Sequence, residues 1–196
     1  MTSQRIAPLQ PPLPPGVAAL MLKLIPPGMA PPQLFAAFAK NEGLFGFLVN
    51  AGVIGPTGLL DRRTLSRELR ECLILRTCVA AGNDYEFNLH VQTISGRMGL
   101  TPTQIDDVRR PTPDPSLWPQ SAICAMNLTD ALVRRLSVSE EVYAQCRQHF
   151  DEAMLIEMTQ LIGLYVGVAM QVALIRPRFD TYTSSEPILA RPQPAI

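Results

Sequence analysis

The stretch TLSRELRECLILRTCVAAGNDYEFNLHVQTISGRMG, residues 64–99, contains the strongest secondary-structure pattern in this chain. Apolar residues recur at helical spacing over residues 64–81, and Gly82 stands where a helix commonly ends in a left-handed residue. A second helix is predicted over 84–98, with Gly99 just past its end. Because the connection at Gly82 is so short, we expect the two helices to form an antiparallel pair.

The rest of the interior is also predicted to be helical. It has few alternating runs of β-branched residues and long stretches with a 3.6-residue period, so we predict an all-α fold. Capping boxes over Thr101–Gln104 and over 137–140 each predict the start of a helix, and the second of these helices is expected to reach about Phe150. Other helices are expected to start at Pro31–Pro32, within 44–60, at 119 and at Glu152.

Nineteen prolines are concentrated toward the two ends of the chain. A proline-rich segment cannot be helical throughout, because each interior proline removes a backbone donor. We therefore divide the chain into an extended N-terminal arm (1–32), a helical domain (33–175) and a proline-containing C-terminal tail (176–196).

The segment 152–175 is predicted to be the most apolar helix. From Met158 to Ile175 it carries no charged residue, a length that reaches the threshold for a membrane span. The polar residues Thr159 and Gln171 and the lack of a positive flank argue against a span, so we expect no membrane association. The pattern instead predicts a central helix that is buried on all sides, in a bundle or an oligomer.

The amino-acid composition indicates which classes of partner the protein binds. Seventeen Lys and Arg balance seventeen Asp and Glu over 196 residues, which argues against nucleic-acid binding. Charged residues make up only 17% of the chain and apolar residues 47%, so we expect surface to be buried between copies in a homo-oligomer. Gly163 and Gly167, four residues apart, would allow another helix to approach closely.

The cysteines Cys72, Cys78, Cys124 and Cys146 include no C-x-x-C pair. With only two histidines and no paired ligand spacing, a structural zinc site is not expected. Reduced, mostly buried thiols are typical of a cytoplasmic protein, and no signal peptide is evident. We therefore expect a cytoplasmic location.

The helix pair brings three titratable side chains toward one layer. At roughly 1.5 Å per residue, Glu71 and His90 differ by about 5–6 Å along the axis, and Glu86 shares a helical face with His90. Two carboxylates and an imidazole in an apolar layer have shifted pKa values and can pass protons near neutral pH. Two alternatives stay open: an ordinary Glu–His face with a structural role, and a metal site built from all three residues.

Three motifs carry a resemblance to a known family. They are Arg70-Glu71-Cys72-Leu73-Ile74-Leu75-Arg76, then Tyr85-Glu86-Phe87-Asn88-Leu89-His90, then Gly99-Leu100 with Ile105. This arrangement resembles the carboxymuconolactone decarboxylase family, which shares the alkylhydroperoxidase D-like fold. The resemblance implies an alkylhydroperoxidase D-like helical bundle that assembles as trimers or hexamers, with dimers among longer relatives.

The resemblance also suggests roles for individual residues. Glu71 falls on the glutamate that serves in proton relay in the peroxidase branch, and His90 falls on the histidine that closes the second motif. In that branch a C-x-x-C pair precedes the histidine, but those places hold Asn83 and Glu86 here. Thiol peroxidase chemistry therefore lacks both its nucleophile and its resolving thiol.

The predicted function is a cofactor-independent acid–base enzyme of decarboxylase or lyase type, acting on a small carboxylated or lactone substrate. Loss of carbon dioxide needs a cation to hold the acid group and a proton donor for the carbanion. Arg67, Arg70, Arg76 and Arg97 lie near enough in sequence to supply the cation; we assign substrate binding to Arg67, Arg70 and Tyr85 and catalysis to Glu71, Glu86 and His90.

Within this assignment, Glu86 or His90 supplies the proton, Glu71 orients the imidazole, and no metal or other cofactor is required. One alternative is a non-catalytic oligomeric binding or scaffold protein with the same fold. The least favoured alternative is a thiol-dependent redox protein that uses Cys72 or Cys78, because a six-residue separation on one helix turns the two thiols apart.

Overall fold

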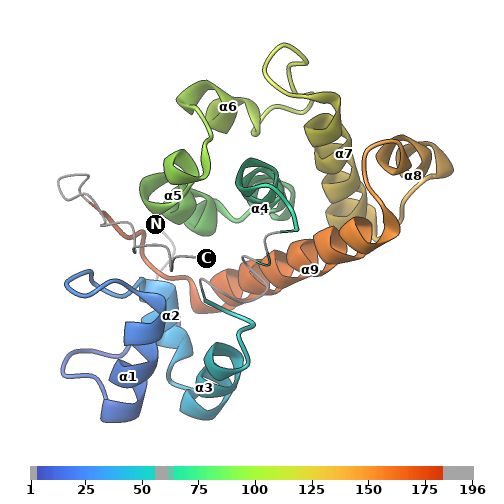
Figure 1. Ribbon diagram of the computed structural model, residues 1–196. Helices are drawn as coiled ribbons and strands as arrows, with labels where there is room; N and C mark the ends of the chain where they lie inside the picture. Colours follow the sequence, from blue (N-terminus) through green and yellow to red (C-terminus); the bar gives the residue numbers. More distant parts are fainter. Residues whose placement is uncertain (1–3, 56–61, 63, 183–196) are drawn as a thin grey trace, which may run out of the picture.

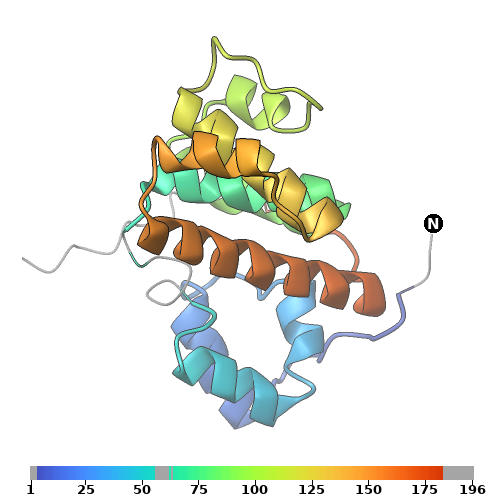
Figure 2. The same ribbon diagram turned by 90° about the vertical axis from the view of Figure 1, so that its right-hand side faces the viewer.

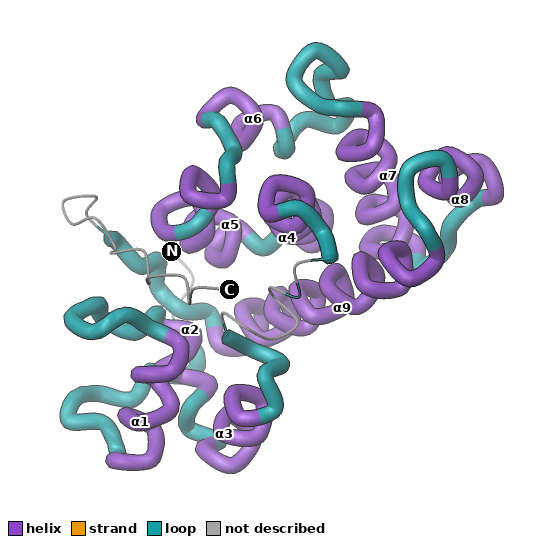
Figure 3. Tube along the Cα trace, in the orientation of Figure 1, coloured by secondary structure: helices purple, strands orange, loops and turns teal. Residues whose placement is uncertain are grey.

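The computed structural model of the protein describes residues 4–55, 62 and 64–182. All regular structure in these ranges is helical, which confirms the all-α prediction (Figures 1 and 3). The elements are α1 (Pro15–Leu24), α2 (Gln33–Phe38), α3 (Glu42–Asn50), α4 (Arg67–Ala81), α5 (Asp84–Thr93), the 3₁₀ helix η2 (Ser95–Met98), α6 (Pro102–Asp107), α7 (Gln120–Arg135), α8 (Glu140–Arg147) and α9 (Glu152–Ile175).

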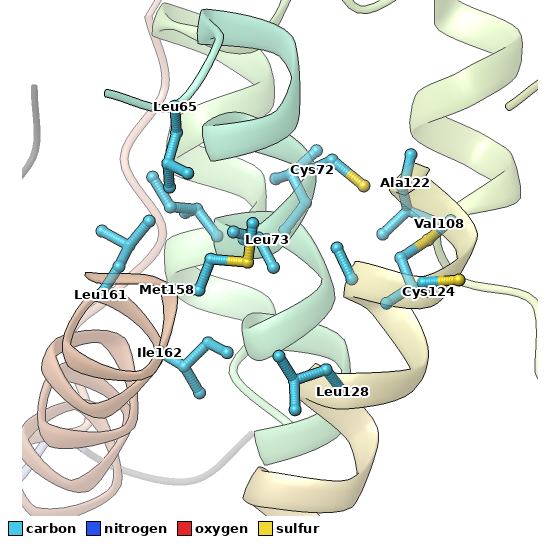
Figure 4. Close-up of a cluster of buried hydrophobic side chains, with 14 of the residues drawn as sticks. Leu65, Cys72, Leu73, Val108, Ala122, Cys124, Leu128, Met158, Leu161 and Ile162 are labelled. Carbon is cyan, nitrogen blue, oxygen red and sulfur yellow. The ribbon is translucent and has the colours of Figure 1, made fainter. Parts of the chain in front are cut away.

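Helix α4 runs through the main hydrophobic core, where it packs against α7 and α9 (Figure 4). Ser66 caps its first turn by accepting a hydrogen bond from the Leu69 backbone N–H at 3.2 Å. At its other end Gly82 has a φ of 67°, a left-handed conformation that glycine adopts without steric cost. Every residue from Arg70 to Cys78 is buried. The predicted helix that ends before Gly82 is confirmed, although it begins at Arg67 and not at residue 64.

Helix α9 lies between two layers, with α1–α3 on one side and the helices of the main core on the other (Figure 2). It contacts α4, α5, α7 and α2. Met158 and Tyr165 are buried on this helix, but Ile156, Met170 and Leu174 are 65%, 68% and 59% exposed. The prediction of a helix buried on all sides is therefore wrong for the single chain, because the described helices cover only part of its circumference.

Among the described residues, α9 is also the helix with the length and composition of a membrane span. Its most apolar 18 residues have a mean hydropathy of 1.7, and 28% of that stretch is buried inside the chain. The core helix of a soluble protein passes the same test, so length and apolar content alone do not place α9 in a membrane.

The N-terminal region is not extended over the whole of residues 1–32, contrary to the prediction. Helix α1 begins at Pro15, where the missing N–H of proline leaves no helical hydrogen bond unmade. Val17 and Met21 of α1 pack with Phe45 of α3 in a second hydrophobic core. The burial of these side chains stabilises a helix that the proline count alone did not predict.

Two local predictions differ from the structure. Helix α5 ends at Thr93, and Ile94, with a φ of −128°, breaks the predicted longer helix before η2. Helix α8 is capped by Ser139, which accepts a hydrogen bond from the Val142 backbone N–H at 3.3 Å. The predicted capping box is wrong because Glu140 is the first residue of the helix, from which its side chain does not reach back to the N-cap.

Residues 176–182, here named the C-terminal strap, connect the end of α9 to α2 and α5. The Asp180 carboxylate accepts hydrogen bonds from the Gln33 backbone N–H at 3.1 and 3.2 Å. The Tyr182 backbone N–H donates to Gln92 Oε1 at 2.8 Å. Residues 183–196 of the predicted tail lie outside the described residues.

Candidate active site

A buried Glu–His pair joins α4 to α5. His90 Nδ1 lies 3.0 Å from Glu71 Oε1 and 3.2 Å from Glu71 Oε2. Ser95 donates a hydrogen bond from Oγ to Glu71 Oε1 at 2.6 Å. Glu71 is 1% exposed and His90 is 4% exposed. The structure therefore brings Glu71 and His90 together away from water, as predicted.

The second ring nitrogen of His90 faces Tyr165 and Glu86. His90 Nε2 lies 3.2 Å from the Tyr165 hydroxyl and 3.5 Å from Glu86 Oε1. The His90 and Tyr165 rings meet edge to face, with centroids 5.4 Å apart and an interplanar angle of 79°. Because Nδ1 faces a carboxylate, it carries a hydrogen, and Nε2 is left to face Tyr165 and Glu86.

The electrostatics of the pair favour the charged forms. Burial by itself lowers the pKa of His90, but the Glu71 carboxylate, with a further contribution from Glu86, raises this pKa from 6.5 to about 10. Burial acts to raise the pKa of Glu71, but His90 and Ser95 hold it below its ordinary value. At neutral pH the pair is therefore an imidazolium and a carboxylate.

Two buried polar atoms in the first part of α5 and at its N-cap have unused hydrogen-bonding capacity. Glu86 Oε2 and Asn83 Nδ2 are buried and have no hydrogen-bond partner within the described part of the chain. Asn83 Oδ1 caps α5 by accepting a hydrogen bond from the Glu86 backbone N–H at 3.2 Å. Asn83 thus has a structural role through its oxygen, while its nitrogen and Glu86 Oε2 are available to a water or a ligand.

Arg70 is the arginine that lies beside the cluster. It is 8% exposed, and its guanidinium contributes to the low pKa of Glu71. Its Nη2 contacts Met98 Sδ at 3.1 Å. The role of Arg70 in holding a substrate carboxylate stays a prediction.

The other predicted arginines are directed elsewhere. Arg67 is exposed in the first turn of α4, so its placement does not support the predicted role in substrate binding. Arg97 donates to the Thr93 carbonyl at 2.6 Å from an exposed position. Arg76 is 1% exposed and forms an ion pair with Asp130. Helical geometry separates these side chains from the cluster although they are close in sequence.

Tyr85 is buried, but its hydroxyl lies with the C-terminal strap. It donates a hydrogen bond to Asp180 Oδ2 and accepts one from the Leu34 backbone N–H at 3.1 Å. The Tyr85 and Phe179 rings have centroids 6.1 Å apart. The Tyr85 hydroxyl is therefore not brought to the His90 cluster, and the predicted substrate-binding role of Tyr85 requires the strap to move.

Sequence reasoning missed Ser95 and Tyr165. Ser95 contacts Glu71 from η2, after the helix break at Ile94, and the sequence shows no sign of that break. Tyr165 had a signal, because a buried tyrosine usually places its hydroxyl against a polar partner. A tyrosine in the middle of the uncharged stretch of α9 is such a residue.

The thiol and metal alternatives gain no support from the geometry. Burial raises the pKa of Cys72 to about 12 and the pKa of Cys78 well above its ordinary value, so both are thiols at neutral pH and poor nucleophiles. In the described ranges, no group of three or more His, Cys, Asp or Glu side chains is arranged to hold a metal ion.

Comparison with known proteins found one family whose profile matches part of the chain. Residues 56–131 match the profile of the Carboxymuconolactone decarboxylase family. That range includes α4 and α5, and with them Glu71, Glu86 and His90. Searches of curated proteins and of solved structures found no match. Residues 56–131 of the chain are therefore similar to the carboxymuconolactone decarboxylase family.

Proposed function

We propose that the protein is a cofactor-independent acid–base enzyme of decarboxylase type, acting on a small carboxylated or lactone substrate. The observation that carries the proposal is the buried imidazolium of His90, which is held by Glu71 at Nδ1 and faces the buried Glu86 with Nε2. A general acid must be protonated at the working pH, and Glu71 keeps His90 in that state.

In the proposed reaction Arg70 holds a carboxylate of the substrate. The bond to the departing carboxyl carbon breaks, carbon dioxide leaves, and the electron pair passes into the lactone carbonyl as an enolate. His90 transfers its Nε2 proton to the substrate carbon, and Glu71 stabilises the Nδ1–H tautomer that is left. A solvent proton then restores the imidazolium.

The substrate must reach a cluster that is enclosed. Glu71 and His90 are almost fully buried, and neither of the two described cavities is lined by them. The C-terminal strap covers the outer side of α5 through Phe179 and Asp180. Displacement of this strap is therefore part of the proposed mechanism.

The test compares the two histidines of the chain. The variant His90→Gln is expected to lose activity on carboxymuconolactone, or on other carboxylated lactones in a panel, by at least about 10²-fold, because it removes the general acid. The matched control, His149→Gln, removes an exposed histidine and is expected to keep full activity. Carbon dioxide release is the measurement, with circular dichroism to check folding.

Two results would contradict the proposal. One is full activity in a folded His90→Gln protein. The other is the absence of turnover by the unmodified protein over the whole panel. That result would favour the second candidate, a non-catalytic binding protein, which is supported by the burial of Glu71 and His90.

A second proposal concerns assembly: the protein is a homo-oligomer in which the exposed face of α9 packs against another copy. Ile156, Met170 and Leu174 are exposed on this helix. Nothing lies within 4 Å of a Cβ built at Gly163 or Gly167, so the helix backbone is open to close approach. An exposed apolar face of this kind is typical of an interface.

Introducing a charge on this face is expected to dissociate the oligomer. The variant Met170→Glu would bury a carboxylate at the interface, so its mass by light scattering at micromolar concentration should fall to that of a smaller species. Leu22→Glu is the control, because Leu22 of α1 is 63% exposed, close to the 68% of Met170. An unmodified protein that is monomeric would contradict the proposal.

A further inference from the structure

A cavity of about 320 Å³ lies apart from the His90 cluster and is lined by four arginines. Arg76 comes from α4, Arg109 and Arg110 follow α6, and Arg134 comes from α7, which also supplies Asp130. The cavity has the size of a small-molecule site. Its residues have no part in the proposed acid–base chemistry.

Arg76 builds the wall of this cavity and has little capacity left for a ligand. It is 1% exposed and binds Asp130 Oδ1 from Nε at 2.9 Å. Its Nη1 donates to the backbone carbonyls of Val108 and Arg110, both at 2.7 Å. Arg76 therefore neutralises Asp130 and fixes the backbone from which the next two arginines project.

The other three arginines retain donors for a ligand. The side chains of Arg109, Arg110 and Arg134 are 48%, 62% and 53% exposed. Each forms one ion pair at the long end of the ion-pair range: Arg109 with Asp84 and Arg110 with Asp107, both at 3.4 Å, and Arg134 with Asp130 at 3.7 Å. Arg109 also lies over the Phe87 ring, with its guanidinium carbon 3.7 Å from the ring centroid. Ion pairs of this length made by an exposed guanidinium are weak and easily exchanged.

The lining of the cavity is positively charged, because four guanidinium groups face one carboxylate, that of Asp130. Outside the lining, the carboxylates of Asp84, Asp107 and Asp114 interact with Arg109 and Arg110 and partly neutralise them. Asp107 is occupied, because it accepts hydrogen bonds from Trp118 Nε1 at 2.8 Å and from the Asp114 backbone N–H at 3.0 Å. An anion with several oxygens would complete this set of donors.

We propose that this cavity binds the phosphate group of a small molecule through Arg109, Arg110 and Arg134. A phosphate group presents three or more oxygens to three separate guanidinium groups, whereas a single carboxylate presents two. Either free phosphate or a phosphomonoester has this group. The site is distinct from the His90 cluster and does not depend on the proposed reaction.

The test is calorimetric titration of the full chain with inorganic phosphate and, separately, with phenyl phosphate, at constant ionic strength set by chloride. Saturable binding of one phosphate group per chain is expected with at least one of these probes. The variants Arg110→Gln and Arg134→Gln are each expected to weaken it at least about tenfold, since each removes a charge-assisted hydrogen bond. The relative affinity of the two probes separates a free phosphate from an ester.

Arg135→Gln is the matched control, because Arg135 follows Arg134 on α7, is exposed, and does not line the cavity. It is expected to leave the affinity unchanged. Three results would overturn the proposal: no saturable binding of either probe, equal weakening by Arg134→Gln and Arg135→Gln, or tighter binding of the dicarboxylate malonate than of both phosphate probes. Thermal unfolding of each variant establishes that it is folded.

Discussion

Replacing Arg76 by methionine is expected to lower the free energy of unfolding by about 3–5 kcal/mol, the range for removing one partner of a buried ion pair. Arg76 holds Asp130 together with the carbonyls of Val108 and Arg110. The methionine keeps the unbranched apolar part of the side chain but supplies no donor, so these acceptors lose their partners. Urea unfolding followed by circular dichroism measures the change.

Two further variants make the measurement specific. Arg135→Met changes an exposed arginine in the same way and is expected to stay within about 0.5 kcal/mol of the unmodified protein. Adding Asp130→Leu to Arg76→Met is expected to cost less than the sum of the two single changes, because the partners share one interaction. Additive losses, or a loss below about 1 kcal/mol for Arg76→Met, would show that the network contributes little.

The second large effect is expected for Glu71→Gln, which removes a charge from the buried pair at nearly constant shape. At neutral pH the variant is expected to lose about 3 kcal/mol of stability, because the His90 imidazolium loses its carboxylate and the Ser95 hydroxyl loses a charged acceptor. Without the Glu71 carboxylate, burial lowers the pKa of His90 and only Glu86 acts to raise it, so the pKa of His90 falls.

The pH dependence of this loss has a definite sign. The folded-state pKa of His90 is raised from 6.5 to about 10, so its stabilising contribution is complete below pH 6.5 and is lost as the pH rises toward 10. The pKa of Glu71 is lowered from 4.5, so its contribution is present above pH 4.5 and is lost in more acidic solution. The difference in stability between the unmodified protein and Glu71→Gln should therefore narrow between pH 6.5 and 10.

Unfolding free energies across this pH range test the prediction. Both proteins carry the same four cysteines, so the titration of unfolded thiols cancels in the difference between them. His149→Gln is the control for a histidine outside the pair and should leave the pH profile unchanged. A difference between the proteins that stays constant with pH would mean that His90 is not charged in the folded state.

The meeting of Glu71 and His90 could be predicted because it is a local property of one helix pair. The turn at Gly82 reverses the chain, and the constant rise of a helix then determines which residues stand opposite each other. The caps formed by Ser66 and Asn83 are local in the same sense, since each acts within three residues.

Contacts between distant segments were not accessible to the same reasoning. Tyr165 lies 75 residues from His90 in the chain, and no spacing rule states which helix will cover the imidazole. Helix α1 was not predicted for a related reason, because the prolines that flank it favour an extended chain. The helix is stable because Val17 and Met21 pack against Phe45, and the sequence alone does not show that contact.

By itself, the sequence determined the helical class, the antiparallel pair and the placing of a carboxylate opposite an imidazole, because periodicity, caps and turn length act over short distances. Only the tertiary structure decided that this pair is dry, that Tyr165 faces Nε2 of His90, that the Tyr85 hydroxyl lies against Asp180, and that α9 keeps an apolar face exposed. These properties depend on how helices that are far apart in the chain pack together, and a local sequence pattern does not predict that packing.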